Sequence, residues 1–282
     1  MKKTILSLIL SLSFTGSALA CTLFGATGIG VEGGGTLVVK NRDWKPTYQK
    51  VELVAPAGGY RYYALLTGKK NTFDAGGINE KGLFVAMSTV GSIPKAERAL
   101  YPKFRTQDGK RANDYMLTHY ATVLEVVESK ENIWSEPVNF IVGDKDSLAI
   151  IEVLPGGKRS ITYQENGTVC HTNHYVDKDT VQGNKKIGKS SLTRYNRIRE
   201  LLNEHIGKFI VNDFWTMSKD LNAGPDNSIF RTGSKPQGTR TVAELVANLP
   251  KDGNFSLEIR YQPTPEATQW QSKTITPKDF QK

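Results

Sequence analysis

Cys21 is the residue whose type and position most directly suggest chemistry. The twenty residues before it begin with lysines, continue with an apolar run broken only by serines, and end in Ala18-Leu19-Ala20. This is the pattern of a secretory signal peptide, and the apolar run is too short to span a membrane. We therefore predict that residues 1–20 are removed, that the mature protein is periplasmic or secreted, and that Cys21 is its first residue.

An N-terminal cysteine carries a nucleophile and a base in one residue. Its α-amine has an ordinary pKa of about 7.7–8.0, so a neutral fraction at pH 7 can accept the proton of the thiol. The thiolate would attack an acyl carbonyl and form an acyl-cysteine, which water then hydrolyses. Such a site also needs a carboxylate to orient the amine and donors to hold the oxyanion. A lipoprotein in which Cys21 carries lipid is the alternative, although Ala18 stands where lipoproteins prefer leucine.

The first predicted elements bring charged residues back to Cys21. Residues 22–30 and the β-branched, apolar run 36–39 flank three consecutive glycines, which favours a hairpin. In an antiparallel pair, the run Lys-Asn-Arg-Asp-Trp at 40–44 then folds back near Cys21. Asp43 could orient the α-amine, and a neighbouring basic residue could favour the thiolate.

The rest of the chain predicts a single domain over residues 21–282. Strands are expected at 51–55, 60–66, 83–87, 138–142, 148–153, 168–175, 255–261 and 268–275. Helices are expected at 113–129, 192–206, 212–221 and 242–249. Thr241 and Glu244 match a capping box for the last helix, and Asn166-Gly167 is a hairpin signal. Strands and helices do not alternate regularly, which favours layered sheets and helices.

Four short motifs occur in order along the chain: Cys21-Thr22, the run at 40–44, Asn-Glu-Lys-Gly-Leu at 79–83, and Thr-Asn-His at 172–174. Together they resemble the choloylglycine hydrolase and penicillin V acylase family of linear amide hydrolases. They are at least as similar to the related acyltransferases that act on isopenicillin N. The likeness spans most of residues 21–245. It implies an α+β fold, the four-layer αββα sandwich of the N-terminal nucleophile (Ntn) hydrolases, with two packed antiparallel sheets between helices.

The resemblance implies a catalytic role for four residues. Cys21 matches the nucleophile, and Asp43 matches the carboxylate near the amine. Asn173 matches an asparagine that helps to position the amine and the reacting carbonyl. Arg194, which precedes Tyr195, matches a site arginine that is followed by an aromatic residue. On the residues alone, a helix-surface arginine would be the simpler interpretation of Arg194.

Two positions depart from the family's pattern. The relatives usually show Arg-Asn-x-Asp where this chain has Lys40-Asn41-Arg42-Asp43. Either Lys40 or Arg42 therefore supplies the basic residue of the site, and lysine lacks the planar fork of arginine. The asparagine of the oxyanion hole falls at about Thr89, whose hydroxyl or backbone N–H could replace it. Both departures weaken the expectation of bile-salt specificity in particular.

The remaining reactive residue types favour structural roles. His171 and His174 are three residues apart on a predicted strand and so face opposite sides, which argues against a shared metal ion. Cys170 is either a buried free thiol or a disulfide partner of the first cysteine in an oxidising compartment. Arg231 and Arg240 either contribute to the pocket or only flank other elements.

Composition excludes several classes of protein. The 282 residues carry a net charge of +9, which becomes +7 for the predicted mature 262 residues, and the basic residues are scattered. Aromatic residues do not interleave with them, so we expect no nucleic-acid partner, and no later apolar stretch predicts stable membrane insertion. Two cysteines are too few for a disulfide scaffold or a four-cysteine zinc site. We expect neither a cofactor nor a metal.

The sequence therefore predicts an exported cysteine amidase or acylase that hydrolyses the C–N bond of a small linear N-acyl amide. Penicillin V, conjugated bile acids and N-acyl amino acids all fit this description. Acyl transfer or dipeptide cleavage on the same scaffold is the alternative among enzymes, and a non-catalytic periplasmic lipoprotein or binding module is the alternative outside them. The sequence does not reveal the acyl preference or the oligomeric state, and a homo-oligomer is left open.

Overall fold

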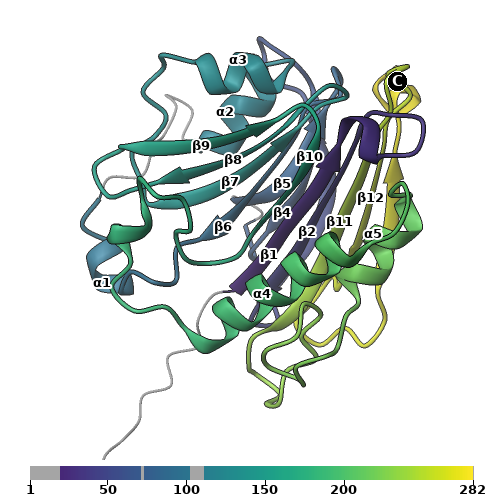
Figure 1. The fold of residues 1–282 in the computed structure, drawn as a ribbon. Coiled ribbons are helices and arrows are strands. Elements are labelled where there is room, and N and C mark those ends of the chain that lie inside the picture. Colours follow the sequence, from purple (N-terminus) through teal and green to yellow (C-terminus); the bar gives the residue numbers. More distant parts are fainter. Residues whose placement is uncertain (1–19, 71–72, 102–110, 282) are drawn as a thin grey trace, which may run out of the picture.

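Two antiparallel sheets form the centre of the molecule (Figure 1). The computed structural model describes residues 20–70, 73–101 and 111–281, so the predicted signal peptide lies outside the described residues except for Ala20. Within the described residues, the six-stranded sheet has the spatial order β10 (Gly167–His171), β1 (Ala20–Thr27), β2 (Thr36–Trp44), β11 (Arg240–Leu249), β12 (Ser256–Tyr261) and β13 (Gln271–Ile275). The seven-stranded sheet follows chain order, with β3 (Gln49–Val54), β4 (Tyr62–Thr67), β5 (Phe73–Asn79), β6 (Phe84–Thr89), β7 (Val138–Gly143), β8 (Leu148–Val153) and β9 (Arg159–Gln164).

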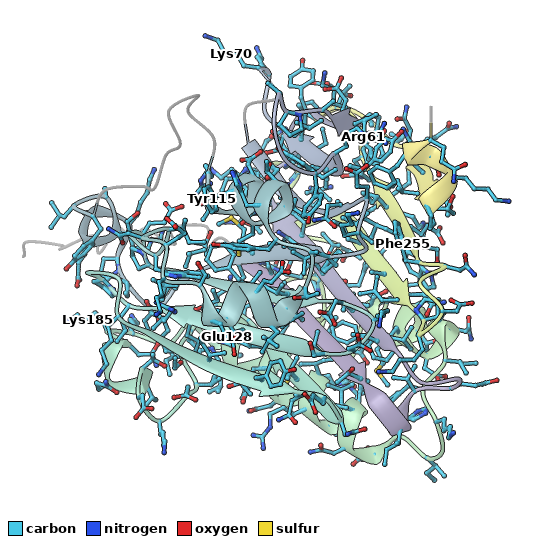
Figure 2. All side chains as sticks on the ribbon, turned by 90° about the horizontal axis from the view of Figure 1, so that it is seen from above. Arg61, Lys70, Tyr115, Glu128, Lys185 and Phe255 are labelled. Carbon is cyan, nitrogen blue, oxygen red and sulfur yellow. The ribbon has the colours of Figure 1, made fainter. Side chains whose placement is uncertain are left out.

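Helices cover the outer face of each sheet (Figure 1). On the seven-stranded sheet lie α2 (Ala112–His119) and α3 (Val123–Glu128), which the labelled Tyr115 and Glu128 mark in Figure 2. On the six-stranded sheet lie α4 (Lys189–Glu204) and α5 (Val211–Ser218). The connections contain the short helix α1 (Lys95–Arg98) and three 3-10 turns, at Gly28–Gly30, Val181–Gly183 and Pro277–Phe280. This layering confirms the predicted αββα sandwich. None of the described helices is long and apolar enough to cross a membrane.

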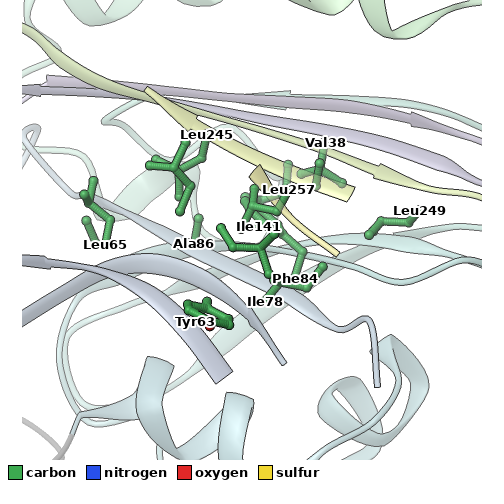
Figure 3. Close-up of a cluster of buried hydrophobic side chains, with 14 of the residues drawn as sticks. Val38, Tyr63, Leu65, Ile78, Phe84, Ala86, Ile141, Leu245, Leu249 and Leu257 are labelled. Atoms are coloured by element: carbon green, nitrogen blue, oxygen red, sulfur yellow. The ribbon is translucent and has the colours of Figure 1, made fainter. Parts of the chain in front are cut away.

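The space between the two sheets is filled by apolar side chains (Figure 3). Val38, Leu245 and Leu257 from the six-stranded sheet meet Phe84 and Ile141 from the seven-stranded sheet, and all five are fully buried. Burial of apolar surface is the main favourable contribution to such a core. This packing holds β1 in its place within the six-stranded sheet, and Cys21 lies near the start of β1.

The predicted helix over 242–249 is wrong, because these residues belong to β11 in the middle of the six-stranded sheet. Leu245 faces the core between the sheets and Val246 faces the outer helices, so both faces of the strand are buried. Apolar residues on both faces remove the alternation of a half-buried strand and leave a spacing that also fits a helix. Thr241 and Glu244, expected as a capping box, instead hydrogen-bond to residues of other elements.

Two other segments differ from the prediction in length. The helix expected over 113–129 is broken into α2 and α3, and the Thr122 hydroxyl accepts a hydrogen bond from the backbone N–H of Glu125 at 3.2 Å at the start of α3. The strand expected over 168–175 ends at His171, after which the chain forms a loop. The other predicted strands and helices are confirmed, with small shifts at their ends.

The sequence does not predict β5 or β9. Gly76 and Gly77 lie inside β5 although glycine is depleted in strands, and a Cβ on Gly77 would be 2.2 Å from the carbonyl oxygen of Tyr63. Glycine is thus required where β4 and β5 approach closely at a bulge. The predicted hairpin at Asn166-Gly167 is also wrong, because this turn carries the chain from β9, at the edge of one sheet, to β10, at the edge of the other.

Candidate active site

Strand pairing places Cys21 directly opposite Arg42, as the predicted hairpin requires. Because side chains alternate along a strand, Cys21, Lys40 and Arg42 share the face of the sheet that looks toward the seven-stranded sheet. Leu23, opposite Lys40, packs in the core on this same face. Asp43 points to the opposite face, toward the outer helices. The predicted site residues of β2 are therefore divided between two faces of one strand.

The backbone of Cys21 is held by two side chains that lie far along the chain, Asn173 at its nitrogen and Arg194 at its carbonyl oxygen. The nitrogen donates a hydrogen bond to Oδ1 of Asn173 at 2.9 Å, and Nη2 of Arg194 donates to the same oxygen at 2.8 Å. Nη1 of Arg194 also donates to the carbonyl oxygen of Cys21 at 2.5 Å and to the Thr22 hydroxyl at 2.9 Å. In the full chain this nitrogen is a peptide nitrogen bonded to Ala20, and it stands where the free α-amine would lie after cleavage.

Arg194 is a buried residue of α4 and not a surface arginine. The loop after β10 carries Asn173, and hydrogen bonds to both its side chain and its backbone fix its orientation. Its Nδ2 donates to the carbonyl oxygen of Thr89 at 2.8 Å, and its backbone N–H donates to the Ser191 hydroxyl at 3.0 Å. Its carbonyl oxygen accepts from the backbone N–H of Gly91 at 2.7 Å. Thr89 thus reaches the site through its carbonyl group, and a donor role for Thr89 at an oxyanion stays a prediction.

Asp43 lies on the strand paired with β1, and one of its two carboxylate oxygens has no hydrogen-bond partner among the described residues. Its Oδ1 accepts a hydrogen bond from the Thr241 hydroxyl at 2.7 Å, whereas Oδ2 is buried without a hydrogen-bond partner among the described residues and lies 4.0 Å from Nη1 of Arg231. Burial raises the pKa of Asp43 to about 6, against the effect of the nearby Arg194 and Arg231, which favour the carboxylate. Asp43 also pairs in register with Ala20, the residue that precedes the nitrogen of Cys21.

The two basic residues of β2, between which the sequence does not decide, have different surroundings. Nζ of Lys40 donates to the carbonyl oxygens of Ala75 and of Met87, the latter at 2.7 Å. Burial lowers the pKa of Lys40 to about 8. Nη1 of Arg42, by contrast, is buried without a hydrogen-bond partner among the described residues, and the guanidinium lies 5.2 Å from the centre of the Trp44 ring. Burial likewise lowers the pKa of Arg42, to about 10.

The structure adds residues whose place in the site the sequence does not reveal. Arg231, which the sequence leaves undecided, faces Asp43, whereas Arg240 is turned away and donates to carbonyl oxygens of the 235–236 loop. Ser191 holds the backbone of Asn173 and also contacts Nδ1 of His174 at 2.8 Å. A serine or arginine of this kind has no local signature, because its partner is defined only by the folded chain.

The remaining reactive side chains do not join the site. His171 pairs with Glu152 at 2.7 Å, whereas Nδ1 of His174 contacts the Ser191 hydroxyl, and the two rings contact different oxygens of Thr172. Both cysteines are free thiols, so the alternative of a disulfide between them is wrong. Cys170 packs with the cluster under the outer helices, and burial raises its pKa to about 12. Among the described residues, no group of three or more histidine, cysteine or acidic side chains could hold a metal ion.

Comparison with known proteins identifies the family of the chain. A family model described as acyl-coenzyme A:6-aminopenicillanic acid acyl-transferase matches residues 31–257. No curated protein matches the chain significantly.

Solved structures show the same fold at low sequence identity. Penicillin V acylase from Agrobacterium tumefaciens is 16% identical, with a TM-score of 0.54 over 91% of this chain and 86% of the acylase. A variant of conjugated bile acid hydrolase from Clostridium perfringens is 14% identical, with a TM-score of 0.57 over 91% of this chain and 96% of the hydrolase. An N-acylethanolamine-hydrolyzing acid amidase ortholog from Caenorhabditis elegans is 16% identical, with a TM-score of 0.53 over 80% of this chain and 92% of the amidase.

Proposed function

Because the chain belongs to the acyl-coenzyme A:6-aminopenicillanic acid acyl-transferase family, we propose that it hydrolyses a linear amide through an acyl-enzyme on Cys21. The observation that carries this proposal is the meeting of Cys21 with Asn173 and Arg194, which lie more than 150 residues away in sequence. A merely structural cysteine would not need a buried arginine and an asparagine on its backbone nitrogen and carbonyl group.

Maturation supplies the base of the reaction. Signal peptidase removes residues 1–20 during export, which frees the α-amine of Cys21 in the periplasm or outside the cell. Ala20 is buried in β1, so this cleavage precedes the pairing of β1 with β2. The free oxygen of Asp43 and Oδ1 of Asn173 then accept hydrogen bonds from the amine and hold its lone pair toward the thiol.

Acylation of Cys21 follows from this geometry. The amine takes the thiol proton, the sulfur attacks the carbonyl carbon of the amide, and a tetrahedral intermediate forms. Asn173 has a second N–H on Nδ2 beyond the one given to Thr89, and this N–H and the Thr89 hydroxyl stabilise the oxyanion. The ammonium group then protonates the leaving nitrogen as the C–N bond breaks, and the amine product departs.

Water completes the cycle. The neutral α-amine removes a proton from a water molecule, which attacks the carbonyl carbon of the acyl-cysteine. The C–S bond breaks, the thiol regains its proton from the ammonium group, and the carboxylic acid is released.

The experiment measures amine release from penicillin V, a glycine-conjugated bile acid and N-decanoyl amino acids. N-terminal sequencing of the exported protein should begin Cys-Thr. Cys21→Ala should abolish amine release while the far-UV spectrum is kept, and the matched variant Cys170→Ala should retain it. An active Cys21→Ala variant would falsify the acyl-enzyme scheme.

Acyl transfer to an amine is a second candidate, favoured by the acyltransferase description of the matching family. It shares the acyl-cysteine and differs only in the acceptor that attacks it. The ratio of acid to new amide, measured while an added amine competes with water, separates the two. A product that is mainly new amide at millimolar amine would identify a transferase.

A further inference from the structure

We propose that Arg42 binds a carboxylate of the substrate, next to the amide that is cleaved. The substrates would then be N-acyl α-amino acids, and the inference rests on the proposed amidase function of Cys21. The side chain of Arg42 is the part of the site that the hydrolytic scheme does not use.

Register places Arg42 where it can reach the substrate. Arg42 is the direct cross-strand neighbour of Cys21, and both side chains leave the sheet on the same face. The Cβ atoms of such neighbours lie about 4.5–5.5 Å apart. A substrate whose carbonyl carbon contacts the sulfur therefore has its nearest substituents within the range of the guanidinium group.

Among the described residues, Arg42 forms no ion pair with an acidic side chain. Only 4% of its surface is exposed, and its Nη1 has no hydrogen-bond partner among the described residues. The neighbouring Asp43 points to the opposite face, where its carboxylate faces Arg231 and bonds Thr241. The Trp44 ring, 5.2 Å away, offers the cation a π face but no acceptor atom in the plane of the guanidinium.

An unpaired buried cation is costly unless a ligand supplies the missing charge. A buried charge without a partner destabilises the folded state. Lys40, on the same face, avoids this cost by donating to two backbone carbonyl oxygens. The described residues offer no hydrogen-bond acceptor to Nη1 of Arg42, so an anionic ligand is the group that would complete its surroundings.

The chemistry of the pair indicates an α-carboxylate on the amine side of the substrate. In an N-acyl α-amino acid, one carbon separates the scissile nitrogen from the carboxylate, so the two groups fit the short span between Cys21 and Arg42. The planar fork of arginine binds a carboxylate through two parallel hydrogen bonds, whereas lysine acts as a point charge. Lys40 and Arg42 would therefore have distinct tasks, with Lys40 fixed to the sheet and Arg42 bound to the substrate.

The experiment compares substrates that differ only in this charge. The probes are the glycine and glycinamide amides of phenylacetic and decanoic acids, and kcat/KM is measured by amine release. We expect the wild-type protein to prefer the glycine conjugates by about 10- to 100-fold, the range of a charge-assisted hydrogen-bonded pair. Arg42→Gln should remove this preference, mainly through KM, and keep activity on the glycinamide conjugates. The control Arg199→Gln, an exposed arginine of α4, should keep the preference.

A binding measurement separates this inference from the proposed function. Titration calorimetry of Cys21→Ala with the same four compounds requires no turnover. The inference is supported if Cys21→Ala binds the glycine conjugates more tightly than the glycinamide conjugates and the double variant with Arg42→Gln does not. This holds even if the wild-type protein hydrolyses none of the probes. Absence of hydrolysis would count against the proposed amidase function alone. Equal binding or equal hydrolysis of charged and neutral probes by proteins that retain Arg42 overturns it. An equal loss on both probes in Arg42→Gln also overturns it, because Arg42 would then act on the thiol.

Discussion

Replacing Glu152 tests whether its hydrogen bonds to the two ends of the loop keep Asn173 in position. Glu152 lies in β8 and is 1% exposed. Its carboxylate accepts from Nε2 of His171 at 2.7 Å, from the backbone N–H of Val176 at 2.8 Å and from the Thr180 hydroxyl. His171 ends β10 and Val176 follows the loop, so one carboxylate joins both ends of the segment that contains Asn173.

The expected magnitude follows from the partners that lose their acceptor. Removing one member of a buried pair costs about 3–5 kcal/mol of unfolding free energy. For a protein of this size, Glu152→Ala should therefore lower Tm by about 6–20 °C. A displaced Asn173 should lower kcat by about 100-fold, since a shift of about 1 Å in a catalytic group has this effect. Glu152→Gln keeps the shape and one acceptor oxygen and should recover most of kcat.

The pH dependence gives an independent check on the charge of Glu152. Burial opposes the carboxylate, but the hydrogen bond and charge of His171, together with the Thr180 and Val176 donors, outweigh it, so the pKa of Glu152 lies below its ordinary value of 4.5. A lowered folded-state pKa stabilises the fold above the unfolded pKa and ceases to do so as the pH falls through the folded pKa. The stability difference between the wild type and Glu152→Gln should therefore be constant near pH 7 and shrink below about pH 4.5.

The assays are urea unfolding followed by tryptophan fluorescence and amine release at 25 °C. Glu128→Ala is the matched control, because Glu128 is an exposed acid of α3. If Glu152→Ala unfolds with the same free energy as Glu128→Ala and keeps full kcat, the reasoning is refuted. If Tm falls and kcat does not, Glu152 supports the fold without positioning Asn173.

Two further predictions address the amine and the core. The neutral α-amine that the scheme needs already makes kcat/KM decline below about pH 7.7–8.0. Because burial raises the pKa of Asp43 to about 6 and the scheme needs its carboxylate form, this decline should steepen from about tenfold to about a hundredfold per pH unit below about pH 6. Asp43→Asn should lower kcat/KM and remove the steeper step, and a pH profile from 4.5 to 8 that is unchanged in the variant contradicts the assigned role. Leu245→Ala, at a fully buried position between the sheets, should cost about 2–5 kcal/mol in urea unfolding. A loss below about 0.5 kcal/mol there would mean that the core collapses around the missing side chain.

Site residues close to Cys21 in sequence could be predicted from local rules, whereas those far from it could not. The approach of the 40–44 run to Cys21 follows from local rules, because a glycine turn between a mostly apolar segment and a β-branched run predicts a hairpin. Asn173 and Arg194 carry no such local signal, and only the resemblance of the motifs brought them to the site. The structure brings both to Cys21. It also separates Lys40 from Arg42, because only the folded chain shows which of them meets backbone carbonyl oxygens.

Failures of the fold prediction arose where tertiary contacts overrode the local pattern. β11 is apolar on both faces because it lies between two strands and between two packed layers. Its spacing was therefore as compatible with a helix as with a strand. Gly76 and Gly77 taken in isolation argue against a strand, but the close approach of β4 demands glycine inside β5. The contacts that make β11 and β5 strands come from residues far away in sequence, so a window of about ten residues does not reveal them.

The two-residue period of β2 explains how one strand serves both the thiol and the amine. Lys40 and Arg42 share the face of the Cys21 side chain, and Asp43 lies on the opposite face, so the acid is kept apart from the thiol although it is adjacent to Arg42 in sequence. A shift of one residue in the β1–β2 register would exchange the two faces and place the acid beside the sulfur. The turn at the far end of the hairpin helps to set this register, because the backbone N–H of Gly28 donates to the carbonyl oxygen of Gly35 at 2.9 Å and Gly35 has a φ of +84°. The chemistry proposed for Cys21 therefore depends in part on a glycine that touches none of the residues of the site.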